Sequence, residues 1–144
     1  MILNEKNNLI LLILVAVLVF TGCSNKIKIK GTVTFEDGSP LEQGQIMLES
    51  DKNRVSGKIH KDGSFTLGEL KDGDGVPEGN YDVWITGTFV YPEVTDSTDR
   101  TVTQRYGSEK NLIPRNYNLR SQSGLTFKVE KGGSKSLDIQ VPRN

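Results

Sequence analysis

Polar and apolar residues alternate strictly over residues 26–36. Every odd position there is apolar or glycine, and every even position is polar. Because successive side chains of a strand point to opposite faces, this period of two predicts a half-buried β-strand. The turn formers Asp37-Gly38-Ser39-Pro40 end it.

Shorter segments repeat this pattern along the chain. They predict strands at 45–49, 55–60, 65–67 and 80–86, with a hairpin turn at 61–63. Near the end, we expect the strand carrying Leu125, Phe127 and Val129 to pair, across the turn at 131–133, with the strand carrying Leu137, Ile139 and Val141. No segment after Cys23 has a helical period of useful length. Seven short strands separated by turns predict an all-β fold, a seven-stranded β-sandwich.

The stretch 88–124 departs from this even spacing. Its 37 residues have weak periodicity and are rich in Thr, Ser, Arg and Asn. Loops longer than about 12–15 residues are usually functional or disordered. We therefore expect any binding specificity that is particular to this domain to lie in this stretch. Within it, Thr101-Val102-Thr103 is a candidate edge strand.

An apolar run at 9–20 precedes the strands and leads directly into Thr21-Gly22-Cys23-Ser24. It is too short to span a bilayer core, which needs about 20 residues, but it is typical of the apolar region of a secretory signal. With the chain's only cysteine at its end, the stretch resembles the lipobox of bacterial lipoproteins. The resemblance implies that residues 1–22 are removed and that Cys23 is diacylated. An uncleaved anchor helix and a signal peptide cut elsewhere are the alternatives.

Charge gives no indication of a nucleic-acid partner. The chain has 18 basic and 18 acidic residues, and only Glu5 and Lys6 lie before Cys23, so the remainder is neutral. Binding to nucleic acid would call for a basic excess. Since lipidation would consume the only thiol, no disulfide is expected, and a buried core must hold the fold.

Four segments occur in an order that resembles a known domain family. They are Gly31-Thr32-Val33, residues 40–46 (PLEQGQI), residues 62–67 (DGSFTL) and residues 77–83 (PEGNYDV). Together they are similar to the carboxypeptidase regulatory-like domain, a transthyretin-like β-sandwich. Residues 113–117 (IPRNY), 123–126 (SGLT) and Gly132-Gly133 resemble small bacterial lipoproteins built from that domain. Most of residues 27–141 are covered, and 88–112 are unmatched.

The resemblance implies a fold and a setting, and no reaction. In carboxypeptidases the module is an appendage of the catalytic domain. The enzymatic relatives, hydroxyisourate hydrolases, rely on histidines, an arginine and a C-terminal tetrapeptide resembling Tyr-Arg-Gly-Ser. This chain ends in Val141-Pro142-Arg143-Asn144 and has one histidine, His60. A single imidazole without a cysteine cannot build a usual zinc site, so we expect a solvated His60 and no enzyme.

Acidic residues gather at Asp72, Asp74 and Glu78 in a glycine-rich loop, a composition that suits calcium. The loop fails the EF-hand pattern, because Val76 and Pro77 stand at the third ligand and glycine positions. We therefore expect a solvated turn, with no metal and no cofactor.

Two regions supply candidate contacts for a ligand or partner. Trp84 falls in the polar phase of its strand, so it either presents a ring for a sugar or protein or is covered by the long loop; cover is favoured. The loop is basic and aromatic, a character common at protein and anion contacts. Loop packing with solvated charge is the other interpretation and is slightly favoured. The residues concerned are Arg105, Tyr106, Arg115, Tyr117 and Arg120.

Lys26, Lys28 and Lys30 alternate on the outer face of the first predicted strand. Only Ser24 and Asn25 separate that strand from Cys23, and at about 3.3 Å per residue such a tether reaches about 10 Å. We therefore expect the domain to sit against the membrane, with these lysines attracted to an anionic surface. Protection of an exposed strand edge is a compatible alternative.

The sequence thus predicts a signal peptide (1–22), a lipidated Cys23 with a short tether (23–25), and a transthyretin-like or immunoglobulin-like sandwich (26–144) with a long loop at 88–124. We expect a non-enzymatic lipoprotein of the cell envelope, a structural or protein-interaction module with an envelope protein as partner. A carbohydrate- or other ligand-binding module that uses Trp84 and the long loop is the alternative. By the sorting rule of lipoproteins, Ser24 implies the outer membrane if the host is Gram-negative.

Overall fold

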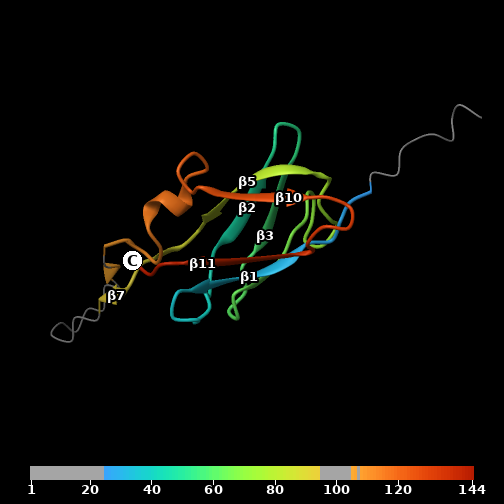
Figure 1. Cartoon of the computed structure of the whole chain (residues 1–144). Helices are drawn as coiled ribbons and strands as arrows, with labels where there is room; N and C mark the ends of the chain where they lie inside the picture. Colours follow the sequence, from blue (N-terminus) through green and yellow to red (C-terminus); the bar gives the residue numbers. More distant parts are fainter. Residues whose placement is uncertain (1–24, 95–104, 107) are drawn as a thin grey trace, which may run out of the picture.

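The computed structural model describes residues 25–94, 105–106 and 108–144. Within this part of the chain, seven strands form two facing sheets, of order β11-β1-β4 and β10-β5-β2-β3 (Figure 1). The strands are β1 (Lys30–Phe35), β2 (Gln45–Glu49), β3 (Arg54–Lys58), β4 (Ser64–Thr66), β5 (Gly79–Thr86), β10 (Leu125–Val129) and β11 (Ser136–Val141). The all-β sandwich predicted from the sequence is confirmed.

The core lies between the two sheets and follows the predicted alternation. In β1 and β2 every second residue is buried, and Tyr81, Val83 and Ile85 of β5 all point inward. Burying one large apolar side chain contributes about 1.5–3 kcal/mol, so this layer supplies most of the stability. Its fully buried members include Ile29, Val33, Leu41, Ile46, Leu48, Phe65, Leu67, Val76, Ile113 and Val141.

The first strand is shorter than predicted and lies inside its sheet. Regular pairing begins at Lys30, and Ile27 instead forms an isolated antiparallel bridge with Val76. β1 is flanked by β11, which is parallel to it, and by β4, which is antiparallel. Since β1 is not an edge strand, the hypothesis of edge protection is wrong for Lys30, whereas Lys26 and Lys28 lie before β1.

The predicted pairing of the last two strands is also wrong. β10 pairs with β5, whereas β11 pairs with β1 in the other sheet. The turn at 131–133 therefore carries the chain from one sheet to the other instead of closing a hairpin. A strand alternates polar and apolar residues whichever strand lies beside it, so the pattern predicts the strand and not its partner.

Short elements occupy the described part of 88–124. β6 (Phe89–Val90) pairs with β9 (Lys110–Asn111), and β7 (Glu93–Val94) pairs with β8 (Arg105–Tyr106). A 3-10 helix, η2 (Arg115–Asn118), packs against β5. The candidate edge strand at 101–103 and the whole signal segment with Cys23 lie outside the described residues. No helix of the described ranges is long and apolar enough to cross a membrane.

The two ends of the sandwich differ in content (Figure 1). Residues 25–29, the β4–β5 loop (67–78) and the β10–β11 turn (130–135) lie together at one end, which we call the N-terminal end. The short strands β6 to β9, residues 87–94 and 108–118, and the last residues, 142–144, lie at the other, which we call the C-terminal end.

Candidate functional site

Two aromatic side chains are exposed at the C-terminal end. Phe89 is 37% exposed and Tyr91 is 55% exposed. The side-chain amide of Gln43 donates to the Phe89 carbonyl (2.9 Å), and the Tyr91 hydroxyl donates to Glu109 Oε2 (3.1 Å). This bond to Glu109 raises the pKa of Tyr91 above its usual value. The polar contacts hold both rings at the surface.

A hollow adjoins the Phe89 ring. Its lining mixes an aromatic ring, an acid, two amides and a guanidinium: Phe89, Glu109, Asn111, Arg115 and Asn144. Arg115 is exposed at the start of η2, as a residue that contacts a partner would be. Among the predicted contact residues whose side chains the structure describes, Arg115 is the one that lies at this surface.

Three uncharged side chains attach this end to the sandwich. Asn118 donates to the Ile85 carbonyl (2.8 Å) and to Thr88 Oγ1 (2.9 Å). Thr88, which has no exposed surface, donates to Asn111 Oδ1 (2.6 Å), and Asn111 donates back to Asn118. The ring satisfies its buried polar groups and fixes the C-terminal end against β5. Thr88 lies 23 residues before Asn111, and no motif marks the three residues.

Trp84 is covered, as the favoured interpretation has it. It is 9% exposed, lies opposite Met47 on β2, and its strand β5 carries η2. A ring with so little free surface is not available for stacking on a sugar. Tyr117 is also partly buried and packs against the core. The side chains of Arg105 and Tyr106 lie outside the description, although their backbone forms β8.

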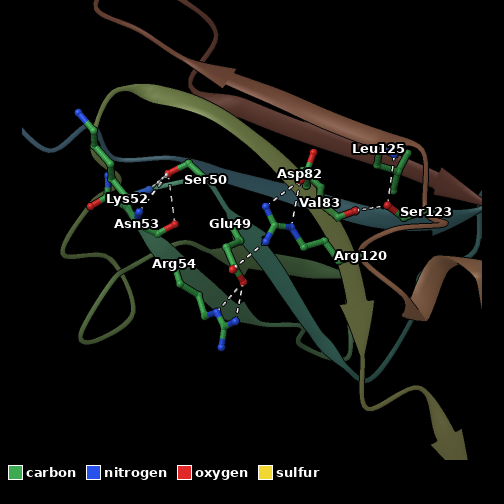
Figure 2. A network of polar contacts seen from close by, with 10 residues as sticks. All are labelled: Glu49, Ser50, Lys52, Asn53, Arg54, Asp82, Val83, Arg120, Ser123 and Leu125. Atoms are coloured by element: carbon green, nitrogen blue, oxygen red, sulfur yellow. Dashed lines mark hydrogen bonds and ion pairs between the residues drawn. The ribbon is translucent and has the colours of Figure 1, made fainter.

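Arg120 is paired with carboxylates on the outer face of the four-stranded sheet (Figure 2). Its guanidinium lies 2.8 Å from Glu49 Oε1 and 2.9 Å from Asp82 Oδ2, and Arg54 lies 2.6 Å from Glu49 Oε2. Because Arg120 is paired with these carboxylates, its guanidinium is not free to bind an anion, the role that the sequence suggested for it. Close by, the Ser123 hydroxyl donates to the Val83 carbonyl (2.5 Å).

At the N-terminal end, Asp74 organises the β4–β5 loop. It accepts hydrogen bonds from the amides of Glu69 (2.7 Å) and Leu70 (3.2 Å). Lys26 lies 2.7 Å from Glu69 and 3.5 Å from Asp74. Desolvation raises the pKa of Asp74, but these amides and Lys26 outweigh it and leave the pKa below its usual value. The hydrogen bond to Glu69 raises the pKa of Lys26.

No three His, Cys, Asp or Glu side chains within the described ranges gather as metal ligands. The contacts of Asp74 and Lys26 correct two expectations. Asp74 is not part of a solvated turn, because its oxygens bind amides and an ammonium. Lys26 is partly buried by its carboxylate partners and does not share the free outer position of Lys28 and Lys30, which are exposed.

Lys26 and Lys28 meet two further lysines at this end. A hollow there is lined by Lys26, Ile27, Lys28, Lys131, Gly132 and Lys135. Leu70, on the neighbouring loop, is 88% exposed. The sequence pattern did not indicate this grouping, since Lys131 and Lys135 belong to a turn more than 100 residues away. His60 lies outside this group and is exposed beside its hairpin turn, as expected.

Comparison with known proteins adds one likeness. No protein-family model and no curated protein matches the chain. The chain is similar to a crystal structure of the major pilin subunit of Bacillus cereus, with 12% sequence identity and a TM-score of 0.48. The match covers 83% of this chain and 30% of the pilin chain, so this chain spans less than a third of the pilin subunit. At this level of similarity, no function follows from the likeness.

Proposed function

We propose that this protein is a non-enzymatic lipoprotein module of the cell envelope. In this proposal lipid on Cys23 holds the N-terminal end at a membrane, and the C-terminal end contacts a partner protein. The transthyretin-like sandwich resembling carboxypeptidase regulatory-like domains serves as the spacer between the two. If the host is Gram-negative, the residue after the cysteine, Ser24, favours the outer membrane.

The observation that carries the proposal is the separation of the two ends (Figure 1). Asn25, two residues after Cys23, lies at one end, and the exposed Phe89 and Tyr91 lie at the other. At about 3.3 Å per residue, the eight-residue β5 alone spans about 26 Å. A membrane anchor at one end would therefore leave the aromatic surface free to meet a partner.

The composition of the C-terminal end favours a protein partner. Aromatic residues and arginine are enriched at protein interfaces, and Phe89, Tyr91 and Arg115 supply both kinds. The carbohydrate alternative was based chiefly on Trp84, which is covered by its own protein. It now depends on Tyr91 as the stacking ring.

Site-specific photocrosslinking of the full chain in its native cells tests the proposal. A crosslinker placed at Tyr91 should capture one abundant protein, whereas one at Lys61, an exposed residue of the β3–β4 turn, should not. Arg115→Glu should abolish the capture in folded protein. Equal capture from both positions, or capture unaffected by Arg115→Glu, would contradict a specific partner surface.

The anchor is tested separately by intact mass and fractionation. The proposal expects a protein that begins at Cys23 with acyl mass, and a Cys23→Ser variant that leaves the membrane fraction. An unmodified Cys23 would overturn the anchor. If no protein is captured and Tyr91→Ala removes retention on a glycan, the carbohydrate hypothesis replaces the protein partner.

A further inference from the structure

The N-terminal end carries the most exposed large apolar side chain of the described residues. Leu70 is 88% exposed, well above the other exposed hydrophobic residues Phe89, Tyr91 and Leu119. A single exposed leucine is ordinary on a protein surface. Leu70 differs because of the rigid turn that presents it and because of the charges around it.

The turn that presents Leu70 is tightly built. A Cβ at Gly68 would lie 1.8 Å from the Lys71 carbonyl oxygen, so only glycine permits this backbone path. Asp74 then binds the amides of Glu69 and Leu70, and Lys26 ties Glu69 and Asp74 to the N-terminal segment. Leu70 is therefore held in a defined position beside the segment that leads to Cys23.

The lysine hollow beside this turn has no acidic residue in its lining. Four carboxylates of the same end are engaged: Glu69 and Asp74 with Lys26, Glu78 with the Lys131 amide, and Glu130 with Lys128, whereas Asp72 is exposed on the β4–β5 loop. Lys28, Lys131 and Lys135 pair with no carboxylate of the described residues. Three exposed ammonium groups thus surround a hollow near an exposed leucine.

We propose that this end docks directly on an anionic lipid surface. Leu70 enters the interface between headgroups and acyl chains, and Lys28, Lys131 and Lys135 lie against the lipid phosphates. An apolar side chain beside basic ones is the composition of interfacial membrane contacts, and a basic patch is a usual second signal beside a lipid chain. The inference rests on the proposed anchoring, because the short tether after Cys23 is what keeps this end at the surface.

Docking would give the sandwich a fixed orientation. A tether that reaches about 10 Å gives the lysines a high effective concentration of headgroups, so individually weak contacts become populated. The C-terminal end would then point away from the bilayer. A flexible tether alone would let the domain tumble and would not select that orientation.

Tryptophan quenching in vesicles tests the insertion of Leu70. The full-length lipidated protein is placed in vesicles of brominated phosphatidylcholine, with or without phosphatidylglycerol. Leu70→Trp should be quenched at least twofold more in the anionic vesicles than in neutral ones. Tyr91→Trp, at the C-terminal end, is the matched control and should match the parent, whose buried Trp84 gives a constant background.

Flotation separates failure of the anchor from failure of the docking. If the protein floats with the vesicles but Leu70→Trp is quenched no more than Tyr91→Trp, the docking is refuted and the anchor stands. If the protein carries no acyl mass and does not float, the proposed anchoring is wrong, and the docking that rests on it is overturned as well.

Charge substitutions test the lysines. In the Leu70→Trp background, Lys28→Gln, Lys131→Gln and Lys135→Gln should each lower the docking equilibrium about fivefold, and the triple variant should lose the salt dependence of quenching. The matched control replaces Lys58, Lys61 and Lys110, exposed elsewhere, and should leave quenching unchanged. If inorganic phosphate at low concentration binds the hollow and abolishes the quenching of Leu70→Trp, the hollow is a soluble-phosphate site and the lipid assignment is wrong.

Discussion

The two ends of the sandwich are held by different kinds of contact. At the N-terminal end, charged groups bind one another and backbone amides, through Lys26, Glu69 and Asp74. At the C-terminal end, uncharged side chains form a ring in which Thr88 is buried and Asn111 and Asn118 are partly buried. Partly exposed ion pairs contribute little to stability, whereas unpaired buried polar groups are costly. The C-terminal end should therefore depend on a few atoms, and the N-terminal end should tolerate change.

Asn118→Ala should have the largest effect, because it opens the ring at the C-terminal end. It removes the donor to the Ile85 carbonyl and to Thr88 Oγ1 and the acceptor of the Asn111 amide, while Thr88 still donates to Asn111. Each unsatisfied buried group costs about 1–3 kcal/mol, and water can replace some of the lost bonds. We therefore expect the free energy of unfolding to fall by about 2–3 kcal/mol in urea titrations.

Asn116→Ala is the control for this experiment. Asn116 lies in the same 3-10 helix but is exposed, so its substitution should change the free energy of unfolding by less than about 0.5 kcal/mol. If Asn118→Ala and Asn116→Ala unfold at the same urea concentration, the ring does not attach the C-terminal end to the sandwich, and the contrast between the two ends is lost.

This contrast also explains what the sequence predicts well. A strand such as β2 is recognised at its correct bounds because alternation is a local property of consecutive residues. The partners of β10 and β11 depend on the path of the whole chain, and their pairing was mispredicted. The polar ring and the lysine hollow are assembled across 20 to more than 100 residues, from residue types that are ordinary at each position.

From the sequence, a covered Trp84 was favoured over an exposed one, but the pattern did not decide between the two. Trp84 alternates with the polar residues of its strand, which placed it on the outer face of β5. The long segment that follows the strand was a candidate to cover that face. In the structure η2 contacts β5, and Asn118 of η2 donates to the Ile85 carbonyl of that strand. The sequence therefore predicted the face that Trp84 occupies, whereas the tertiary structure determines that this face is closed.

Asp74→Asn should have a smaller effect than Asn118→Ala, and one that depends on pH. The pKa of Asp74 lies below its usual value of 3.8, so its ionised form is favoured by folding. Its contribution is complete above pH 3.8 and is lost as the pH falls through the folded pKa. The thermal midpoints of parent and variant should differ at pH 6 and converge below pH 3.8. A constant difference at all pH values would mean that the carboxylate charge plays no part.

Arg120→Met should have the smallest effect and tests whether charge matters outside the N-terminal end. Arg120, 39% exposed, pairs with Glu49 and Asp82, which are 21% and 49% exposed (Figure 2). Solvent screens such pairs, so each should contribute about 0.5 kcal/mol or less, and the methionine retains much of the packing of the arginine stem. A double-mutant cycle with Glu49→Gln isolates the pair, and Arg54→Met serves as control for the other guanidinium on Glu49.

A coupling of about 1.5 kcal/mol or more between Arg120 and Glu49 would change the comparison between the two ends. Residues 119–124 would then be fastened to β5 and β2 by charge as firmly as the C-terminal end is by its uncharged ring. Burial would no longer explain why one end tolerates substitution and the other does not. A small coupling that vanishes at high salt would instead leave Asn118 as the dominant attachment of the C-terminal end, because its hydrogen bonds are uncharged, partly buried and made in part to the buried Thr88.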